Sequence, residues 1–300
     1  MQLLDGKKTA ESVTARLREK VAALQATHGL RPGLAVVLVG NNPASEVYVR
    51  NKVRTAAELG LHSVRHDLPK DATQAQVLAL VAQLNADPAI HGILVQSPPP
   101  PQIDERAITE ALNPAKDVDC FHPYNVGKLT IGDEDGFLPC TPHGVLVLLE
   151  QYGIETRGRH AVVIGRSEIV GKPIALLLAR KAKVGDCTVT LCHSRTRDLG
   201  AITRQADILI AAIGRAELVT ADMVKDGAVV VDVGINRVEA PGSKKGYKLV
   251  GDVAFDAVSA RAAWITPIPG GVGPMTIAML MNNAIKACCR QHGVSAEGLW

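Results

Sequence analysis

Short, uninterrupted runs of aliphatic residues recur along the chain. They constrain its fold more than any other feature of the sequence. LAVVLVG ends at Gly40 and HAVVIG ends at Gly165, and two similar runs, ADILIAAIG and AVVVDVGI, follow the second. A strand that is apolar at every position is buried on both faces, which is typical of a parallel sheet covered by helices. Helical patterns separate these runs, so the sequence predicts an α/β fold.

The apolar runs form two series, each with its own helices. The second series opens with HAVVIG, after a predicted helix that begins near Pro142. The final amphipathic segment, 276–290, can pack back onto the first series, which would make the first domain discontinuous. We therefore expect two α/β domains, 1–144 with 275–300 and 145–274, in a chain of 300 residues that is long enough for two cores.

Composition argues against several classes of partner. The 33 basic and 30 acidic side chains nearly balance and form no long basic run, so we expect no nucleic-acid partner. No apolar run approaches the roughly 20 residues of a membrane-spanning helix, and MQLLDGKKTA lacks the features of a signal peptide. The 6 cysteines include no C-x-x-C pair. We expect reduced thiols and a cytoplasmic protein without a membrane partner.

The histidines give no support for a metal site. The 9 histidines are scattered, and the close pair His62 and His66 falls in a predicted strand rather than at helical ligand spacing. The sequence therefore predicts no bound metal.

The turn after HAVVIG has the context of a dinucleotide site. It runs through GRSEIVGKP into an apolar helix, whose first N–H groups can hold a pyrophosphate. Gly165 supplies the tight turn, but Ser167 replaces the second glycine of the usual fingerprint, and Gly171 comes one position late. A plain strand-to-helix turn is the alternative interpretation of this motif taken alone.

The end of the next predicted strand indicates which dinucleotide is bound. TVTLC is followed by HSRT, where an NAD enzyme would carry an acidic residue for the ribose hydroxyls. The donors of Ser194 and Arg195, with Arg166 in the first turn, suit a 2′-phosphate instead. This pattern favours NADP, with a solvated polar loop as the alternative.

Polar residues of the first domain suggest a second site. Tyr48 and Lys52 are four residues apart on one face of a predicted helix, and apolar neighbours would partly desolvate Lys52. Gln96 ends the strand GILVQ, where ligands of α/β sheets gather. Asp117 or Asp119, in a loop, can accept two parallel N–H bonds from an aminopyrimidine edge. A solvated lysine and turn-forming aspartates are the alternatives.

The segment TPIPGGVGPMT alternates flexible glycines with rigid prolines. Such a loop can close over a flat ligand. A hinge before the last helix would have the same composition, so the segment alone leaves both interpretations open.

Several long motifs in order closely resemble the bifunctional methylenetetrahydrofolate dehydrogenase/cyclohydrolase family. They are YVRNK, GILVQ, KDVD with FHPYNVGKL, PCTPHG, GRSEIVGKP, VDVGIN and PIPGGVGPMT, and the similarity extends from about Asp5 to Lys286. The resemblance implies a homodimer in which a catalytic domain, completed by the C-terminal helix, and a Rossmann-type NADP domain flank a cleft. It also implies NADP-dependent oxidation of 5,10-methylenetetrahydrofolate, followed by hydrolysis of the methenyl product to 10-formyltetrahydrofolate.

The resemblance also assigns roles to individual residues. Lys52 would be the catalytic lysine, Tyr48 would pack on the folate, and Gln96 would hydrogen-bond near the lysine, while Asp119 would anchor the pterin. Further substrate-binding residues would be Val95, Ser97, Pro269, Gly270, Gly271, Val272 and Gly273. The residues lining NADP would be Gly165, Arg166, Ser167, Ser194, Arg195 and Ile235.

Two departures from the family pattern lie beside these residues. Ser97 and a proline run replace the usual Leu-Pro-Leu-Pro, and Cys120 replaces the usual glycine after KDVD. A side chain at position 120 is expected to affect the placing of Asp119 and so the balance of the two activities. Alternative functions are a methylene-pterin dehydrogenase without cyclohydrolase activity, an enzyme of another carrier such as methanopterin, and a non-catalytic NADP-binding protein. Retention of Lys52, Gln96 and Asp119 argues against the first.

Overall fold

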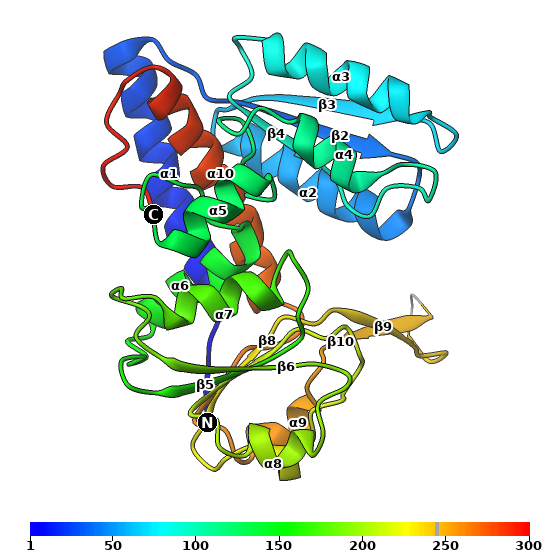
Figure 1. Cartoon of the computed structure of the whole chain (residues 1–300), viewed down its shortest axis with the longest axis vertical. Coiled ribbons are helices and arrows are strands. Elements are labelled where there is room, and N and C mark those ends of the chain that lie inside the picture. Colours follow the sequence, from blue (N-terminus) through cyan, green and yellow to red (C-terminus); the bar gives the residue numbers. More distant parts are fainter. Residues whose placement is uncertain (244–245) are drawn as a thin grey trace. The chain divides into compact units, whose positions relative to one another are not determined.

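The computed structural model describes residues 1–243 and 246–300 as two compact units, which we treat separately. Each unit is built around its own parallel sheet (Figure 1). Among the described residues, no helix is long and apolar enough to cross a lipid bilayer. Unit 1 comprises residues 1–11 and 141–276, and unit 2 comprises residues 12–140 and 277–300.

Three helices cross the boundaries between the units along the chain. They are α1 (Gly6–His28), α6 (Cys140–Gln151) and α10 (Val272–Gln291).

Unit 2 contains a three-stranded parallel sheet in the order β3-β2-β4. Its central strand is buried at every position, which agrees with the run LAVVLVG being a strand covered on both faces. Because the strands are parallel, the residues that follow β2 and β4 gather at one edge of the sheet. The strands are β2 (Gly33–Val39), β3 (His62–Leu68) and β4 (Gly92–Val95).

Helices cover both faces of the sheet in unit 2. Ala35, Val37 and Val39 share a buried cluster with side chains of α3 and α4, and α2 lies on the opposite face (Figure 1). This arrangement follows from the alternation of side chains along a strand. The helices are α2 (Pro43–Glu58), α3 (Gln74–Ala86), α4 (Glu105–Ala111) and α5 (Pro123–Ile131).

Unit 1 contains a six-stranded sheet in the order β1-β11-β8-β7-β5-β6, with parallel neighbours throughout. The chain moves from β5 outward to β6 and then returns to β7 on the other side of β5, which creates a topological switch point. The N-terminal segment, which we assigned to the first domain, supplies β1. The strands are β1 (Gln2–Leu3), β5 (His160–Ile164), β6 (Thr188–Cys192), β7 (Ile208–Ala211), β8 (Val229–Asp232) and β11 (Trp264–Ile265).

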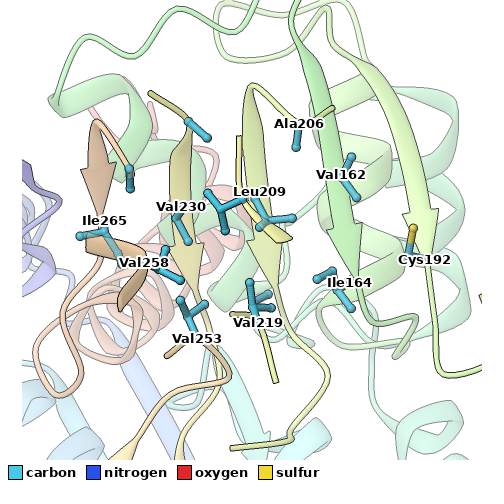
Figure 2. Close-up of a cluster of buried hydrophobic side chains, with 14 residues drawn as sticks. Val162, Ile164, Cys192, Ala206, Leu209, Val219, Val230, Val253, Val258 and Ile265 are labelled. Carbon is cyan, nitrogen blue, oxygen red and sulfur yellow. The ribbon is translucent and has the colours of Figure 1, made fainter. Parts of the chain in front are cut away.

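One face of this sheet carries a continuous apolar core (Figure 2). Ile265, Val230, Leu209, Val162 and Cys192 come from five strands and follow one another across the sheet, and helices α8 and α9 pack against them. Helix α7 lies on the other face (Figure 1). The remaining elements are α7 (Gly171–Ala179), α8 (Leu199–Thr203), the 3₁₀ helix η1 (Ala221–Met223), α9 (Phe255–Ser259) and the antiparallel pair β9 (Asn236–Glu239) and β10 (Tyr247–Val250).

Two buried aspartates tie together the loops at the carboxyl edge of this sheet. Asp232 accepts hydrogen bonds from the backbone N–H groups of Gly234, Asp252 and Val253, each at 2.9 Å. Asp252 in turn accepts from the N–H groups of Ile213 at 2.7 Å and Gly214 at 2.8 Å. The carboxylates therefore satisfy backbone donors that helices and strands leave without partners.

Burial gives Asp232 an unusual proton affinity. Desolvation is the largest influence and raises the pKa of Asp232 to about 6, although the N–H donors of Asp252 and Val253 oppose the shift. An aspartate in an unfolded chain has a pKa of about 3.9. Between these two pKa values the folded chain holds a proton that the unfolded chain has lost, so the contribution of Asp232 to stability falls as the pH rises.

This difference predicts a pH-dependent effect of Asp232→Asn, because asparagine cannot titrate. The unfolding free energy of the natural protein minus that of the variant should fall by about 1–3 kcal/mol between about pH 4 and pH 6.5. Urea denaturation across this range measures the difference. Asp256→Asn makes the same change of charge at an exposed position of α9 and serves as the control; equal pH profiles for the two variants would contradict the prediction.

Candidate active site

A buried lysine and a glutamine meet at the carboxyl end of β4 in unit 2. Lys52, on α2, is 7% exposed, and its Nζ donates to Oε1 of Gln96 at 3.1 Å. Gln96 follows β4 directly, and its backbone N–H bonds to the carbonyl of Val37 at 2.8 Å. The Gln96 Nε2 donates to the carbonyl of Ser97 at 2.7 Å, which leaves the amide oxygen facing the lysine. The sheet and helix thus bring together two residues that are 44 positions apart.

Tyr48 lies one helical turn before Lys52 on α2 and is half-buried. Burial raises the pKa of its phenol. The ring therefore remains a neutral, partly exposed aromatic surface beside the lysine, as packing on a flat ligand requires.

Asp119 lies at the same edge of the sheet. The segment that contains it runs parallel to β4, with Ile93 bridged to Asp117. Asp119 is half-buried, and it also interacts with the buried thiol of Cys140. Burial above all, and then the charge of Asp119 and a hydrogen bond with it, raise the pKa of Cys140 well above its usual range, whereas the charge of Lys52 lowers it. Asp119 and Lys52 are therefore close enough to act on the same thiol.

The structure distinguishes the two aspartates that the sequence left open. Asp117 is 1% exposed and accepts hydrogen bonds from the N–H groups of Phe121 at 3.2 Å and His122 at 2.9 Å, and from Nδ2 of Asn125 at 2.8 Å. Its carboxylate therefore shapes the loop. Asp119, in contrast, is a partly exposed residue.

Asn283 positions this loop from α10. Its Nδ2 donates to the carbonyls of Val118 at 2.8 Å and Leu138 at 2.9 Å, and the residue is 1% exposed. Neither Asn283 nor Cys140 was among the predicted site residues. A polar pair, Asn282 and Asn283, within the apolar segment MLMNNAIKACC was the available signal, because buried amides in a helix need partners elsewhere.

Cys120 adopts a left-handed backbone conformation, with φ of 61°. This conformation favours glycine, which explains why the family pattern has glycine at this position. The side chain is 1% exposed, and its thiol donates to the carbonyl of Phe137 at 3.0 Å. The cysteine is therefore accommodated at the cost of backbone strain. Its thiol also makes a buried contact next to Asp119 that a glycine could not make.

A small pocket in unit 2 adjoins these residues. Its lining includes Val95, Gln96, Asp119 and Phe121. Val95 is half-buried, and Ser97 contributes its carbonyl group to the amide of Gln96 and begins a cis Ser97–Pro98 peptide bond. Val95, Gln96 and Asp119 thus line one pocket at the carboxyl end of β4. Lys52 and Ser97 are not among its lining residues and are linked to the pocket through their hydrogen bonds with Gln96.

The predicted dinucleotide residues of unit 1 lie at the carboxyl ends of β5 and β6. Gly165 has φ of 120°, and a Cβ atom there would lie 2.0 Å from the carbonyl oxygen of Ala212. Its N–H bonds to the carbonyl of Cys192 at 2.9 Å, which joins the first turn to the segment that carries Ser194. Arg166, Ser194 and Arg195 are exposed.

Ser167 has a structural function in this turn. Its Oγ accepts hydrogen bonds from the N–H groups of Val170 at 3.2 Å and Gly171 at 3.3 Å, at the start of α7. The hydroxyl thus shapes the turn where the usual fingerprint has glycine. A Cβ atom at Gly171 would lie 2.1 Å from the carbonyl oxygen of Gly165, so the third glycine is required even at its shifted position.

The proline and glycine loop also belongs to unit 1. A Cβ atom on Gly6 would lie 1.8 Å from the carbonyl oxygen of Gly271, so the loop packs tightly on the start of α1. Ile235 is 43% exposed, and its Cδ1 would lie 3.8 Å from a Cβ atom on Gly273. Gly273 is therefore a neighbour of Ile235, and Pro269, Gly270, Gly271 and Val272 belong to the same unit.

Two family models match the chain. The catalytic domain of tetrahydrofolate dehydrogenase/cyclohydrolase matches residues 4–119, and the NAD(P)-binding domain of the same enzyme matches residues 139–292. The chain belongs to the tetrahydrofolate dehydrogenase/cyclohydrolase family. These matches and the parallel sheets confirm the predicted α/β fold with a dinucleotide-binding part.

Individual members of this family are similar over nearly the whole chain. The bifunctional protein FolD of Moorella thermoacetica is 60% identical over 290 residues, 96% of this chain and 99% of that protein. The crystal structure of the bifunctional FolD enzyme from Campylobacter jejuni has a TM-score of 0.91 and 48% identity, and covers 97% of this chain and 99% of its own. The crystal structure of FolD from Trypanosoma brucei, complexed with NADP cofactor and inhibitor, has a TM-score of 0.91 and 41% identity. It covers 96% of this chain and 97% of its own.

The predicted enzyme class is thereby confirmed. The protein is a bifunctional folate enzyme, a dehydrogenase and a cyclohydrolase. The roles of its individual residues remain predictions.

Replacing Cys120 should separate backbone strain from side-chain packing. Cys120→Gly removes the left-handed strain but also the buried thiol contact, so we expect a stability change within about 1 kcal/mol. Cys120→Val keeps the strain and adds a β-branched side chain, and should destabilise by about 2 kcal/mol or more. Urea denaturation of both variants checks this. Equal losses for glycine and valine would show that backbone conformation does not dominate at this position.

Proposed function

We propose that the protein oxidises 5,10-methylenetetrahydrofolate with NADP and hydrolyses the resulting 5,10-methenyltetrahydrofolate to 10-formyltetrahydrofolate, with Lys52 as the residue that assists proton transfer. The observation that carries this proposal is the partly buried hydrogen bond between Lys52 and Gln96 at the carboxyl end of β4. Burial alone does not distinguish Lys52, because Lys116 is 6% exposed and donates to the backbone carbonyls of Leu84 and Asp87. Lys52 differs in meeting a side-chain amide at the carboxyl end of β4, where ligands of parallel sheets gather.

In the oxidation, the protein chiefly holds the reacting carbons at the right distance. When bound, NADP supplies the hydride acceptor. Positioning alone can contribute a large share of the acceleration when reacting atoms are held about 3–3.5 Å apart. We assign the folate to Tyr48, which packs against its ring system, and to Asp119. The carboxylate of Asp119 accepts two parallel N–H bonds from the aminopyrimidine edge, a task for which the occupied oxygens of Asp117 are unsuited.

The hydrolysis requires water to attack the methenyl carbon and a proton to leave that water. Lys52 is placed to accept or return this proton through its Nζ. Gln96 acts on Lys52 in turn, since its Oε1 fixes one N–H direction of the amine at 3.1 Å. Because the amide Nε2 is held by the carbonyl of Ser97, the oxygen cannot easily rotate away from the lysine.

The cofactor residues of unit 1 suit NADP. Gly165 allows the tight turn before α7, because a Cβ atom there would lie 2.0 Å from the carbonyl oxygen of Ala212. We assign the pyrophosphate to the start of α7. Residues 193–197, which directly follow β6, include no acid for a ribose diol, and Ser194, Arg195 and Arg166 are exposed donors. We therefore assign the 2′-phosphate to these side chains, and FolD of Trypanosoma brucei, which was crystallised with NADP, supports this choice.

We further propose a cytoplasmic homodimer. All 6 cysteines are free and buried, as is typical of a protein from a reducing compartment. The family resemblance supports the dimer, and sedimentation of the purified chain would measure it.

Lys52→Met should abolish cyclohydrolase activity, because methionine fills a similar volume but has no group that can accept or donate a proton. We expect a loss of at least about a hundredfold in turnover of added methenyltetrahydrofolate, with NADP binding unchanged. Decay of methenyl absorbance and a fluorescence titration with NADP measure the two properties. Lys70→Met, at an exposed position of the same unit, is the control. Unchanged hydrolysis in Lys52→Met would refute the assignment.

Arg195→Ala should weaken the preference for NADP over NAD. Loss of charge-assisted hydrogen bonds to a 2′-phosphate is expected to lower the ratio of kcat/KM values for NADP and NAD by about tenfold or more. Initial rates of methylenetetrahydrofolate oxidation with each dinucleotide give this ratio. Arg197→Ala removes another exposed arginine two positions away and should leave it unchanged; a similar fall in both variants would point to general electrostatics instead.

A further inference from the structure

Three residues outside the candidate active site converge at the opposite end of β4. His91 immediately precedes this strand, whereas Gln96 follows it. Cys288 and His292 lie near the end of α10, four positions apart, and so point in a similar direction from the helix axis. One ligand atom from each of the three side chains lies within 4.8 Å of the others. We call these residues the His-Cys-His cluster.

We propose that the His-Cys-His cluster binds one Zn²⁺ ion that joins the end of α10 to the start of β4. One thiolate and two imidazoles form a ligand set that zinc prefers. The Nε2 atoms of His91 and His292 are 3.0 Å apart. Zinc bonds of roughly 2.0–2.3 Å place neighbouring ligand atoms about 3.3–3.8 Å apart, so small side-chain movements would complete the site.

The surroundings of the cluster suit an ion that enters from solvent and is then held. His91 is 4% exposed and Cys288 is fully buried, whereas His292 is exposed. His292 therefore provides the entry side, where a water molecule can take the fourth position. The same elements are already joined, because Nε2 of Gln291 donates to the carbonyls of His91 at 2.8 Å and Ala115 at 3.0 Å.

Two features limit the affinity of this site. The N–H of Gly33 donates to Nδ1 of His91 at 2.8 Å, so the ring proton is on Nε2 and is shared with His292. Zinc bound at Nε2 requires this proton to move to Nδ1, opposite the Gly33 donor. Two buried donors, the Nδ1–H and the Gly33 N–H, would then face each other without an acceptor, which weakens binding by about two to four powers of ten. Burial also raises the pKa of the Cys288 thiol to about 12.

Zinc binding at the cluster changes the protonation of two of its ligands. The Cys288 thiol releases its proton to solvent as the zinc–sulfur bond forms, and the His91 ring keeps its proton count because one nitrogen gains what the other loses. One proton is therefore released for each ion bound. With both penalties, we expect micromolar affinity rather than the much tighter binding of a zinc finger.

The site is separate from the catalytic residues. Gln96 is five positions after His91, which is about 16 Å of extended chain at roughly 3.3 Å per residue. The ion would stabilise unit 2 without touching the Lys52 and Gln96 pair. Bound zinc is accordingly expected to change the melting temperature while leaving dehydrogenase and cyclohydrolase rates unaltered.

Cobalt provides a direct test, because a cobalt–thiolate bond gives a charge-transfer band in the near ultraviolet. The full chain is freed of metal with a chelator and titrated with Co²⁺. We expect a band that saturates at one equivalent, is lost on adding Zn²⁺, and is absent in Cys288→Ser but present in Cys289→Ser, the matched neighbour. The absence of a band in the folded natural chain, or its loss only in Cys289→Ser, would overturn the proposal.

A second pair of variants avoids disturbing the core. His292→Gln and His28→Gln each replace an exposed histidine. Zn²⁺ should raise the melting temperature of the natural chain and of His28→Gln, while His292→Gln should need at least about tenfold more Zn²⁺ for the same rise. Equal responses in all three proteins would show that zinc binds elsewhere, and would leave the folate chemistry untouched.

Discussion

Parallel pairing of strands that are buried on both faces determines where both units can place functional groups. In such sheets every strand points the same way, so the residues that follow the strands collect along one edge. Gln96 follows β4 and Gly165 follows β5 for this reason. The neighbouring strand then fixes what lies beside each of them, Val37 for Gln96 and Cys192 for Gly165, through backbone hydrogen bonds of 2.8 and 2.9 Å.

Buried polar side chains then make these edges rigid. Asp117 and Asn283 hold the segment around Asp119, and Asp232 and Asp252 hold the loops of unit 1. Each satisfies backbone groups that would otherwise be buried without partners, at a penalty of about 1–3 kcal/mol each. The site residues can therefore come from loops and still be held in one geometry, as positioning of a substrate requires.

The sequence predicted the features that depend on local pattern. Uninterrupted apolar runs marked the strands, and helical spacing placed Tyr48 beside Lys52. It could not choose between Asp117 and Asp119, because that choice depends on which backbone N–H groups the folded loop presents. Asn283 escaped prediction because its partners lie 165 and 145 positions away. The His-Cys-His cluster did so because His91 and His292 are 201 positions apart.

The paired aspartates of unit 1 have a consequence for its local motions. Residues 213–214, 234 and 252–253 share two carboxylates through short hydrogen bonds. If one of these segments detached, a buried acid would lose donors that the other segments cannot replace. Their amide protons should therefore exchange with solvent as a group, at a rate set by one common opening event. The carboxyl edge of the dinucleotide-binding sheet would then behave as a single cooperative element rather than as independent loops.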